Sequence, residues 1–350
     1  MTRRAVSSSV VALMIAATAL CESTRTVRAT LSAAPGTAFV VENLAGRMTV
    51  VPGDTDAVVA IATVHAESAE LAGAVSLEQV RGEKGEPTLR VRYPLGFHRT
   101  VRYPGTARST AEYDGRRVRV SGTSGVLLYA DVEVHVPGHA VIATFRNLFG
   151  SLDARNVTGT IVLDTSGADI VAHALQGDIK ADVGSGDVTA DQIKGKFSCD
   201  TGSGECDVTG FDGDQLLLDT GSGGVRVRDV KAARISADTG SGNVGIERAD
   251  TAELVADTGS GSVQAELIGS RLRRIRADTG SGSVTLRLPA DASFELLADQ
   301  GSGNLTCDFP DATPIAKKRM IVGYRRGDGR IRIDVDTGSG DVTVSPVSGK

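Results

Sequence analysis

Six copies of the sequence Asp-Thr-Gly-Ser-Gly contain the residues of this chain whose types could do chemistry. They begin at Asp200, Asp219, Asp238, Asp257, Asp278 and Asp336. Asp-Thr-Gly-Ser also surrounds the catalytic carboxylates of aspartic proteases, which work as two aspartates that share a proton across a cleft. Six equal motifs at regular spacing cannot each supply half of one such pair. We therefore expect no catalytic residue among them.

The motif is part of a longer repeat. Looser copies begin at Asp182 and Asp299, and most neighbouring copies are 18 to 21 residues apart. Within a copy, apolar and polar residues alternate on both sides of the glycine turn, as in residues 233–238 and 244–246. This alternation, with a period of two residues, indicates that each repeat consists of a strand, a glycine turn, a second strand and a polar turn.

The repeat predicts the fold. A unit of about 19 residues cannot bury its own apolar face, but stacked copies can, with equivalent strands paired in parallel. We predict an all-β fold: a parallel β-solenoid of about ten rungs over residues 141–350, behind an irregular all-β cap at residues 30–140. An irregular insertion is expected at about residues 309–334, ahead of a last rung that begins at Asp336.

In such a stack the aspartates have a structural role. A short Asp side chain accepts backbone N–H groups in a turn, and glycine supplies a positive φ. The predicted turn aspartates are Asp182, Asp200, Asp219, Asp238, Asp257, Asp278, Asp299 and Asp336. Because carboxylates about 4.8 Å apart repel by roughly 0.9 kcal/mol in water, they must face solvent, bind N–H groups or share cations. A weak Ca²⁺ site therefore stays open, for example at Asp182 and Asp187 with Asp200 and Glu205, although no dedicated metal site or cofactor is expected.

Residues 1–29 have the pattern of an export signal, with two arginines followed by an apolar run at residues 5–20. Val27-Arg28-Ala29 fits a cleavage site, and so does Ala17-Thr18-Ala19. A lipoprotein acylated at Cys21 is the lesser alternative, because Leu20 stands where that pattern wants a small residue. We expect a mature chain outside the cytoplasm, periplasmic, at the cell surface or secreted, that does not span a membrane.

Cys199 and Cys206 flank one of the glycine turns. A disulfide across the turn is one interpretation, and two buried thiols is the other. We expect two buried free thiols at these positions.

A basic and aromatic insertion lies at about residues 81–119, where ten Arg and Lys face four Asp and Glu. An exposed surface for an anionic glycan or a protein would use cations and aromatic rings of this kind. Its candidate residues are Tyr93, Phe97, Arg99, Arg102, Tyr103 and Tyr113. A solvated hairpin insertion without a partner is the favoured alternative.

Several stretches together resemble the bacterial DUF4097 family of β-strand-repeat proteins, also labelled putative adhesins. They are residues 39–50, residues 132–138 leading into 147–150, residues 288–294, and the closing residues 332–342. The resemblance covers almost all of the mature chain. It implies a parallel β-helix-like fold and a cell-envelope setting, and it transfers no active-site residue.

We predict a non-catalytic exported protein of the cell envelope that serves as a scaffold or an adhesin-like binding surface. Its partner would be an envelope protein or a glycan, and a net charge of −5 gives no sign of nucleic acid. One alternative is a carbohydrate-active β-helix enzyme, a polysaccharide lyase or hydrolase, which needs acids and bases converging in a groove away from the aspartates. The other is a calcium-binding β-roll.

Overall fold

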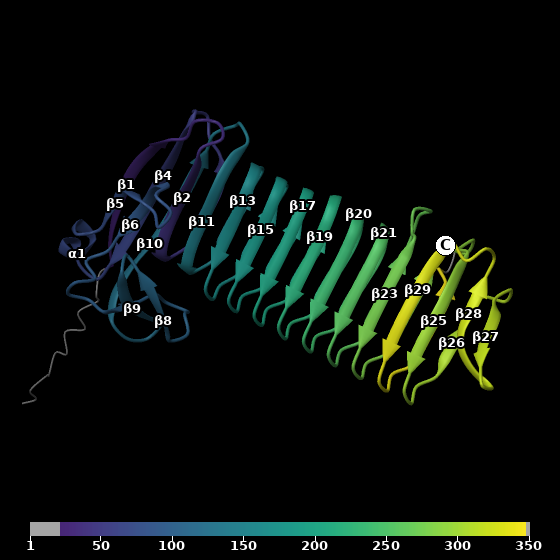
Figure 1. Ribbon diagram of the computed structural model, residues 1–350. Coiled ribbons are helices and arrows are strands. Elements are labelled where there is room, and N and C mark those ends of the chain that lie inside the picture. The colour runs from purple at the N-terminus through teal and green to yellow at the C-terminus, as the bar shows by residue number, and fades with distance from the viewer. Residues whose placement is uncertain (1–21, 348–350) are drawn as a thin grey trace, which may run out of the picture.

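The computed structural model describes residues 22–347, and their regular secondary structure is almost entirely β (Figure 1). They contain thirty strands and one short helix, α1 (Ala69–Gly73). The helix begins after Ser68, whose hydroxyl accepts a hydrogen bond from the backbone N–H of Leu71. In this part of the chain, α1 is much too short to cross a membrane.

Residues 23–136 contain the first layer of the stack and a cover over it. The first layer is residues 38–52, which pair with β11 (Val141–Phe149) and β12 (Leu152–Arg155); the rest of this segment covers the outer side of that layer and is here called the cover. The strands of residues 23–136 are β1 (Ser23–Ser32), β2 (Ala38–Ala45), β3 (Met48–Pro52), β4 (Ala57–Ala66), β5 (Ser76–Arg81), β6 (Pro87–Arg92), β7 (Thr100–Arg102), β8 (Ser109–Tyr113), β9 (Arg116–Ser121) and β10 (Val126–Val136). β2 pairs in parallel with β6, and β3 pairs in parallel with β10. The remaining strands extend from these two pairs.

From Val141 onward each unit supplies two strands, and equivalent strands of successive units pair in parallel (Figure 1). One row, here called the aspartate sheet, contains β11 (Val141–Phe149), β13 (Thr158–Thr165), β15 (Gln176–Val183), β17 (Lys194–Thr201), β19 (Asp212–Thr220), the second halves of β20 (Val225–Thr239) and β21 (Val244–Thr258), then β23 (Arg274–Thr279), β29 (Ile331–Thr337) and β25 (Phe294–Gln300). The other row, the opposite sheet, contains β12 (Leu152–Arg155), β14 (Ile170–His173), β16 (Val188–Asp191), β18 (Cys206–Thr209), the first halves of β20 and β21, then β22 (Val263–Leu267), β24 (Val284–Leu288), β30 (Val342–Pro346) and β26 (Leu305–Cys307).

The core lies between the two sheets. In the layer formed by β15 and β16, Ile179 and Ala181 face inward from one sheet and Val188 and Ala190 from the other, and all four are buried. The pairing register places the same pattern in the next layer, because Ile179 pairs with Phe197 and Val188 pairs with Cys206. A continuous apolar core therefore runs the length of the stack.

In the six Asp-Thr-Gly-Ser-Gly copies, a buried threonine joins the glycine turn to a neighbouring layer of the stack. Thr239 Oγ1 accepts the N–H of Gly242 at 3.0 Å and donates to the carbonyl of Gly223 at 2.8 Å. The same two bonds recur at Thr201, Thr220, Thr258, Thr279 and Thr337. The threonine thus pairs backbone groups that a sharp turn would leave unsatisfied inside the stack.

The glycines of these turns are required for a reason that differs from the expected positive φ. None of the glycines in the six Asp-Thr-Gly-Ser-Gly copies has a φ in the left-handed region. A Cβ on Gly242 would instead lie 1.9 Å from the carbonyl oxygen of Gly223, and one on Gly261 would lie 1.8 Å from that of Gly242. Close approach of the backbones of successive layers excludes a side chain here.

The order of the last layers differs from the order of the sequence, so the expected last rung at Asp336 is wrong. β29 pairs with β23 on one side, where Asp278 faces Asp336, and with β25 on the other, where Asp336 faces Asp299. β30 lies in the same way between β24 and β26. The unit of residues 331–346 is therefore inserted between two units that precede it in the chain (Figure 1). Near-identical repeats pair equally well in either order, so their spacing could not reveal the insertion.

An antiparallel hairpin covers the far edge of β25. It consists of β27 (Thr313–Lys317) and β28 (Met320–Arg326), and it lies within the insertion expected at residues 309–334. β28 pairs with β25, which leaves β27 at the outside (Figure 1). Pro314 and Lys317 of β27 are residues that discourage a further strand from adding to an exposed edge.

The folded chain begins ahead of the expected boundary at residue 30. All ten residues of β1 pair with β4 in antiparallel fashion, from Ser23 opposite Ala66 to Ser32 opposite Ala57. Cleavage after Ala29 would divide this strand. The rest of the expected export signal, residues 1–21, lies outside the described residues.

The close approach of the turns predicts which glycines tolerate a methyl group. Gly242→Ala should lower the free energy of unfolding by about 2–3 kcal/mol, because its Cβ would overlap a backbone oxygen of the preceding layer. Gly245→Ala is the matched control, since its Cβ would meet no atom closer than 3.9 Å. Thermal denaturation followed by circular dichroism measures both. Equal destabilisation by the two variants would contradict the proposed role of the turn glycines.

Candidate functional site: the aspartate face

The outward side of the aspartate sheet carries one carboxylate of the same register position on every strand except β11, where Arg146 occupies that position. The pairing register places nine aspartates in a single file, in the spatial order Asp164, Asp182, Asp200, Asp219, Asp238, Asp257, Asp278, Asp336 and Asp299. Neighbours in the file are one strand spacing apart, about 4.8 Å. We call this file, together with the outward side chains beside it on the same sheet, the aspartate face. It brings together all eight turn aspartates predicted from the sequence.

The file aspartates do not make the turn bonds that the sequence suggested. The bonds between layers come instead from the position after each glycine turn: Asn243 Oδ1 accepts the N–H of Ser262 at 2.8 Å, and Asp187 Oδ1 accepts that of Glu205 at 2.8 Å. Within residues 22–347, the middle of the file has neither an ion pair nor a hydrogen bond to its carboxylates. These residues are Asp200, Asp219, Asp238 and Asp257.

The local environment disfavours charge in the middle of the file. Partial burial, followed by the charge of Asp219, raises the pKa of Asp238 above its ordinary value. Partial burial and then the charge of Asp238 raise the pKa of Asp257, against an opposing effect of Arg276. The middle of the file therefore holds negative charge that no ion pair within the described chain neutralises.

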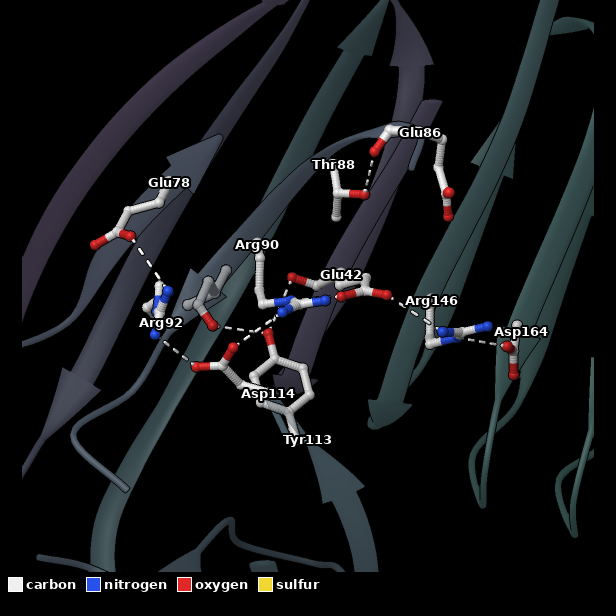
Figure 2. Close-up of polar contacts among 11 residues, drawn as sticks. Glu42, Glu78, Glu86, Thr88, Arg90, Arg92, Tyr113, Asp114, Arg146 and Asp164 are labelled. Atoms are coloured by element: carbon white, nitrogen blue, oxygen red, sulfur yellow. Dashed lines mark hydrogen bonds and ion pairs between the residues drawn. The ribbon is translucent and has the colours of Figure 1, made fainter. Parts of the chain in front are cut away.

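At its N-terminal end the file continues as a run of alternating charge (Figure 2). Arg146 Nε lies 2.8 Å from Asp164 Oδ2, and Arg146 Nη1 lies 3.2 Å from Glu42 Oε1. Arg90 then bridges Glu42 Oε2 at 2.6 Å and Asp114 Oδ1 at 2.9 Å. Burial lowers the pKa of Arg90, but its bonds to Glu42 and Asp114 outweigh this and raise it overall. Sequence spacing alone does not reveal this network, although Arg146 stands 18 residues before Asp164 and is its register partner.

Among the hollows on the aspartate face, two lie toward its ends, and a smaller one, lined by Asp200, Asp219 and Asp238, lies over the middle of the file. The N-terminal hollow has a volume of about 560 Å³. Its floor includes Val40, Ile142 and Val162, and its wall is the loop of residues 83–86 between β5 and β6. Ile142 is 40 % exposed there. This hollow offers an apolar floor beside the alternating charges.

The C-terminal hollow has a volume of about 660 Å³. Leu297 lies on its floor, and Lys317 and Val322 of the β27–β28 hairpin line it together with Arg276 and Asp334. Acids and bases do meet here, but they do so on the aspartate file. The enzyme alternative required a groove away from that file, so this arrangement does not favour it.

The six residues of the expected basic and aromatic surface are not brought together. Tyr93 and Tyr113 are buried, and burial raises the pKa of both phenols. Tyr93 Oη donates to Asn43 Oδ1 at 2.7 Å, and Tyr113 Oη donates to the carbonyl of Val91 at 2.7 Å. Both rings belong to the packing of the cover because the small strands β7 to β9 fold onto it.

The other four residues of that group differ in exposure. Phe97 is 91 % exposed, Arg99 is exposed and Arg102 is half-buried. Tyr103 is half-buried against Tyr129, with ring centres 5.1 Å apart. The expected surface is therefore reduced to Phe97 and the nearby cations.

Cys199 and Cys206 form a disulfide, which differs from the buried thiols expected. Their Cα atoms are 6.7 Å apart. The register places Cys199 beside Ala181 and Cys206 beside Val188, at inward positions on either side of a glycine turn. Two side chains that face each other across a narrow core can be bonded without moving the backbone. Cys307 is a free thiol.

Of the four carboxylates considered for Ca²⁺, all but Asp200 are engaged within the chain, and Glu205 pairs with Arg226. Asp182 pairs with Lys180 at 2.7 Å, and Asp187 accepts the backbone N–H of Glu205. In residues 22–347 no three His, Cys, Asp or Glu side chains are grouped to hold a metal ion.

A family model, Toastrack DUF4097, matches residues 130–345, which is more than half of the chain. No curated protein matches the sequence of this chain. A solved structure from Parabacteroides distasonis, described as a "putative adhesin", is 13% identical over 92% of this chain and 97% of its own, with a TM-score of 0.44. A structure from Parabacteroides merdae with the same description is 12% identical over 93% of this chain and 97% of its own, with a TM-score of 0.33. Another, from Bacteroides fragilis, is 7% identical over 92% of this chain and 97% of its own, with a TM-score of 0.32. TM-scores below 0.5 do not establish a shared arrangement of strands.

The raised pKa of Asp238 predicts how stability depends on pH. A raised carboxyl pKa means that the folded chain holds its proton more tightly than the unfolded chain, so ionisation of Asp238 at neutral pH costs stability. Asp238→Asn should raise Tm by about 1–2 °C at neutral pH. The gain should vanish at about pH 3, where the wild-type carboxyl is protonated in both states.

Asp207→Asn is the matched control, because Asp207 lies on the opposite sheet and is paired with Arg228 at 2.9 Å. This variant should show no gain at neutral pH. A fall in Tm for Asp238→Asn at neutral pH would contradict the charge repulsion assigned to the file.

Proposed function

Because the chain belongs to the Toastrack DUF4097 family, we propose that it is a non-catalytic, exported binding protein of the cell envelope. In this proposal the stacked layers form a parallel β-solenoid of about ten rungs, closed at its N-terminal end by the all-β cap. The solenoid is a rigid scaffold whose binding surface is the aspartate face.

One observation carries the proposal: the file of nine carboxylates in register, four of which have no partner within the described chain. Equal groups repeated at one strand spacing on a stiff sheet can engage several groups of one partner at once. Such contacts reinforce one another because the first contact raises the effective concentration of the rest.

The chemistry of the face favours a protein partner with several Lys or Arg side chains. Charge complementarity speeds the encounter and fixes the orientation of such a partner. Ile142 and Leu297, each more than a third exposed, add apolar contacts toward the two ends. A glycan would be served better by exposed aromatic rings, and Tyr93 and Tyr113 are buried.

The test compares two double variants of equal charge change. Asp219→Asn with Asp238→Asn removes two carboxylates from the middle of the file, and Glu247→Gln with Glu266→Gln removes two from the opposite sheet. The chain is immobilised and exposed to purified envelope proteins and a glycan panel in biolayer interferometry. We expect an envelope protein to bind, with affinity reduced about tenfold by the first variant and unchanged by the second.

Two results would contradict this proposal. Equal loss of binding in both variants would assign the effect to net charge rather than to the face. Binding only of glycans, unaffected by the first variant, would place the site elsewhere.

We also propose that the export signal is removed ahead of β1, because cleavage after Ala29 would leave β4 without most of its partner strand. The intact mass of the protein recovered outside the cytoplasm should give an N-terminus at or before Ser23. An added lipid mass on Cys21 would identify the lipoprotein alternative. An N-terminus at Thr30 in a fully folded protein would show that β1 is dispensable and would contradict this boundary.

A further inference from the structure

The unit of residues 331–346 occupies a slot between two layers that precede it in the chain (Figure 1). In the aspartate sheet, six residues of β29 pair with β23 and seven pair with β25. In the opposite sheet, five residues of β30 pair with β24 and three with β26. Without this unit, the layers on either side of the slot would each present unpaired backbone groups.

The slot is selective for one kind of segment. A Cβ on Gly340 would lie 1.8 Å from the carbonyl oxygen of Gly282 on one side, and one on Gly303 would lie 1.9 Å from that of Gly340 on the other. Thr337 Oγ1 also donates to the carbonyl of Gly282 at 2.9 Å. These contacts are satisfied only by a segment that consists of a strand, a flat glycine turn with a threonine, and a second strand. Apolar residues such as Ile333 and Val344, both fully buried, complete the core between the two layers.

The connection that leads into the slot is short and glycine-rich. Arg326, at the end of β28, and Ile331, at the start of β29, are both partners of Phe294, one on each side of β25. Residues 327–330 therefore carry the chain past the end of β25, over about two strand spacings or 9.6 Å. Gly327 and Gly329 have φ values of 62° and 72°, in the region that favours glycine. This largely exposed connection is the segment about which the unit would have to move, and its departure would also unpair β25 and β26 from the stack, which makes re-entry of an equivalent unit favourable.

We infer that the slot is an interaction surface whose partner is the same segment, residues 331–346, of a second copy of the chain. Exchange of this unit between two copies replaces each pairing with an identical one, so no contact within the slot is lost. The remaining cost is that of bringing two chains together, which a high local concentration reduces. This interaction is separate from the aspartate-face function proposed above and does not depend on it.

Trapping across the slot tests the inference in the full-length chain. Arg276 and Asp334 are register partners on β23 and β29, with outward side chains. One chain carries Arg276→Cys and the other Asp334→Cys, both in a background of Cys307→Ser and Cys21→Ser. The two chains are mixed, warmed to the onset of unfolding, cooled and oxidised. A non-reducing gel then measures the covalent heterodimer.

Two controls define the outcome. One chain with both Arg276→Cys and Asp334→Cys must close an internal disulfide, which verifies that the two positions meet. Chains with Lys180→Cys and Ser198→Cys, register partners inside the stack, report collision and general misfolding. We expect at least about fivefold more heterodimer from the slot pair than from the Lys180 and Ser198 pair. Equal yields from the two mixtures, with the internal disulfide formed, would overturn the inference.

Discussion

The whole structure depends on how closely the glycine turns of successive layers approach one another. Strands that pair in parallel lie about 4.8 Å apart, and a turn stacked at this spacing has no room for a side chain at its closest point. Glycine meets this steric condition. The buried backbone groups of the turn also need hydrogen-bond partners, and the threonine before the glycine supplies one by donating to a carbonyl of the neighbouring layer. When both conditions hold in each repeat, the layers are locked in register.

The pairing register between layers aligns equivalent residues of the repeats on one surface. Because each turn stacks on its neighbour, the aspartates that precede the turn threonines lie in a single file. At the N-terminal end, Arg146 and Arg90 balance the nearby acids and tie the cover to the stack (Figure 2). Between Asp200 and Asp257 no such balance exists in the described chain, so the unpaired charge is concentrated over the middle layers. The same geometry that stabilises the core thus determines where a positively charged partner would be attracted.

Much of this architecture could be predicted from the sequence, and the failures have physical causes. The period of two along each strand predicts burial well, because only one face of each strand can point inward. The sequence suggests a positive φ for the turn glycines because φ is a property of one residue, whereas the constraint at Gly242 comes from a neighbouring layer. Composition suggests an exposed position for Tyr93 and Tyr113 because it does not show which rings find buried hydrogen-bond partners. The insertion of residues 331–346 was hidden because every repeat presents the same pairing pattern.

Hydrogen exchange at the turn amides tests the central claim most directly. The N–H groups of Gly223, Gly242 and Gly261 are bonded to threonine hydroxyls, and those of Gly240 and Gly259 are bonded to carbonyls of the preceding layer. If the turns are stacked layers, exchange resolved by mass spectrometry should be as slow in these glycine-rich peptides as in the strands beside them. Exchange within seconds, as in a solvated loop or an open cleft, would contradict the account.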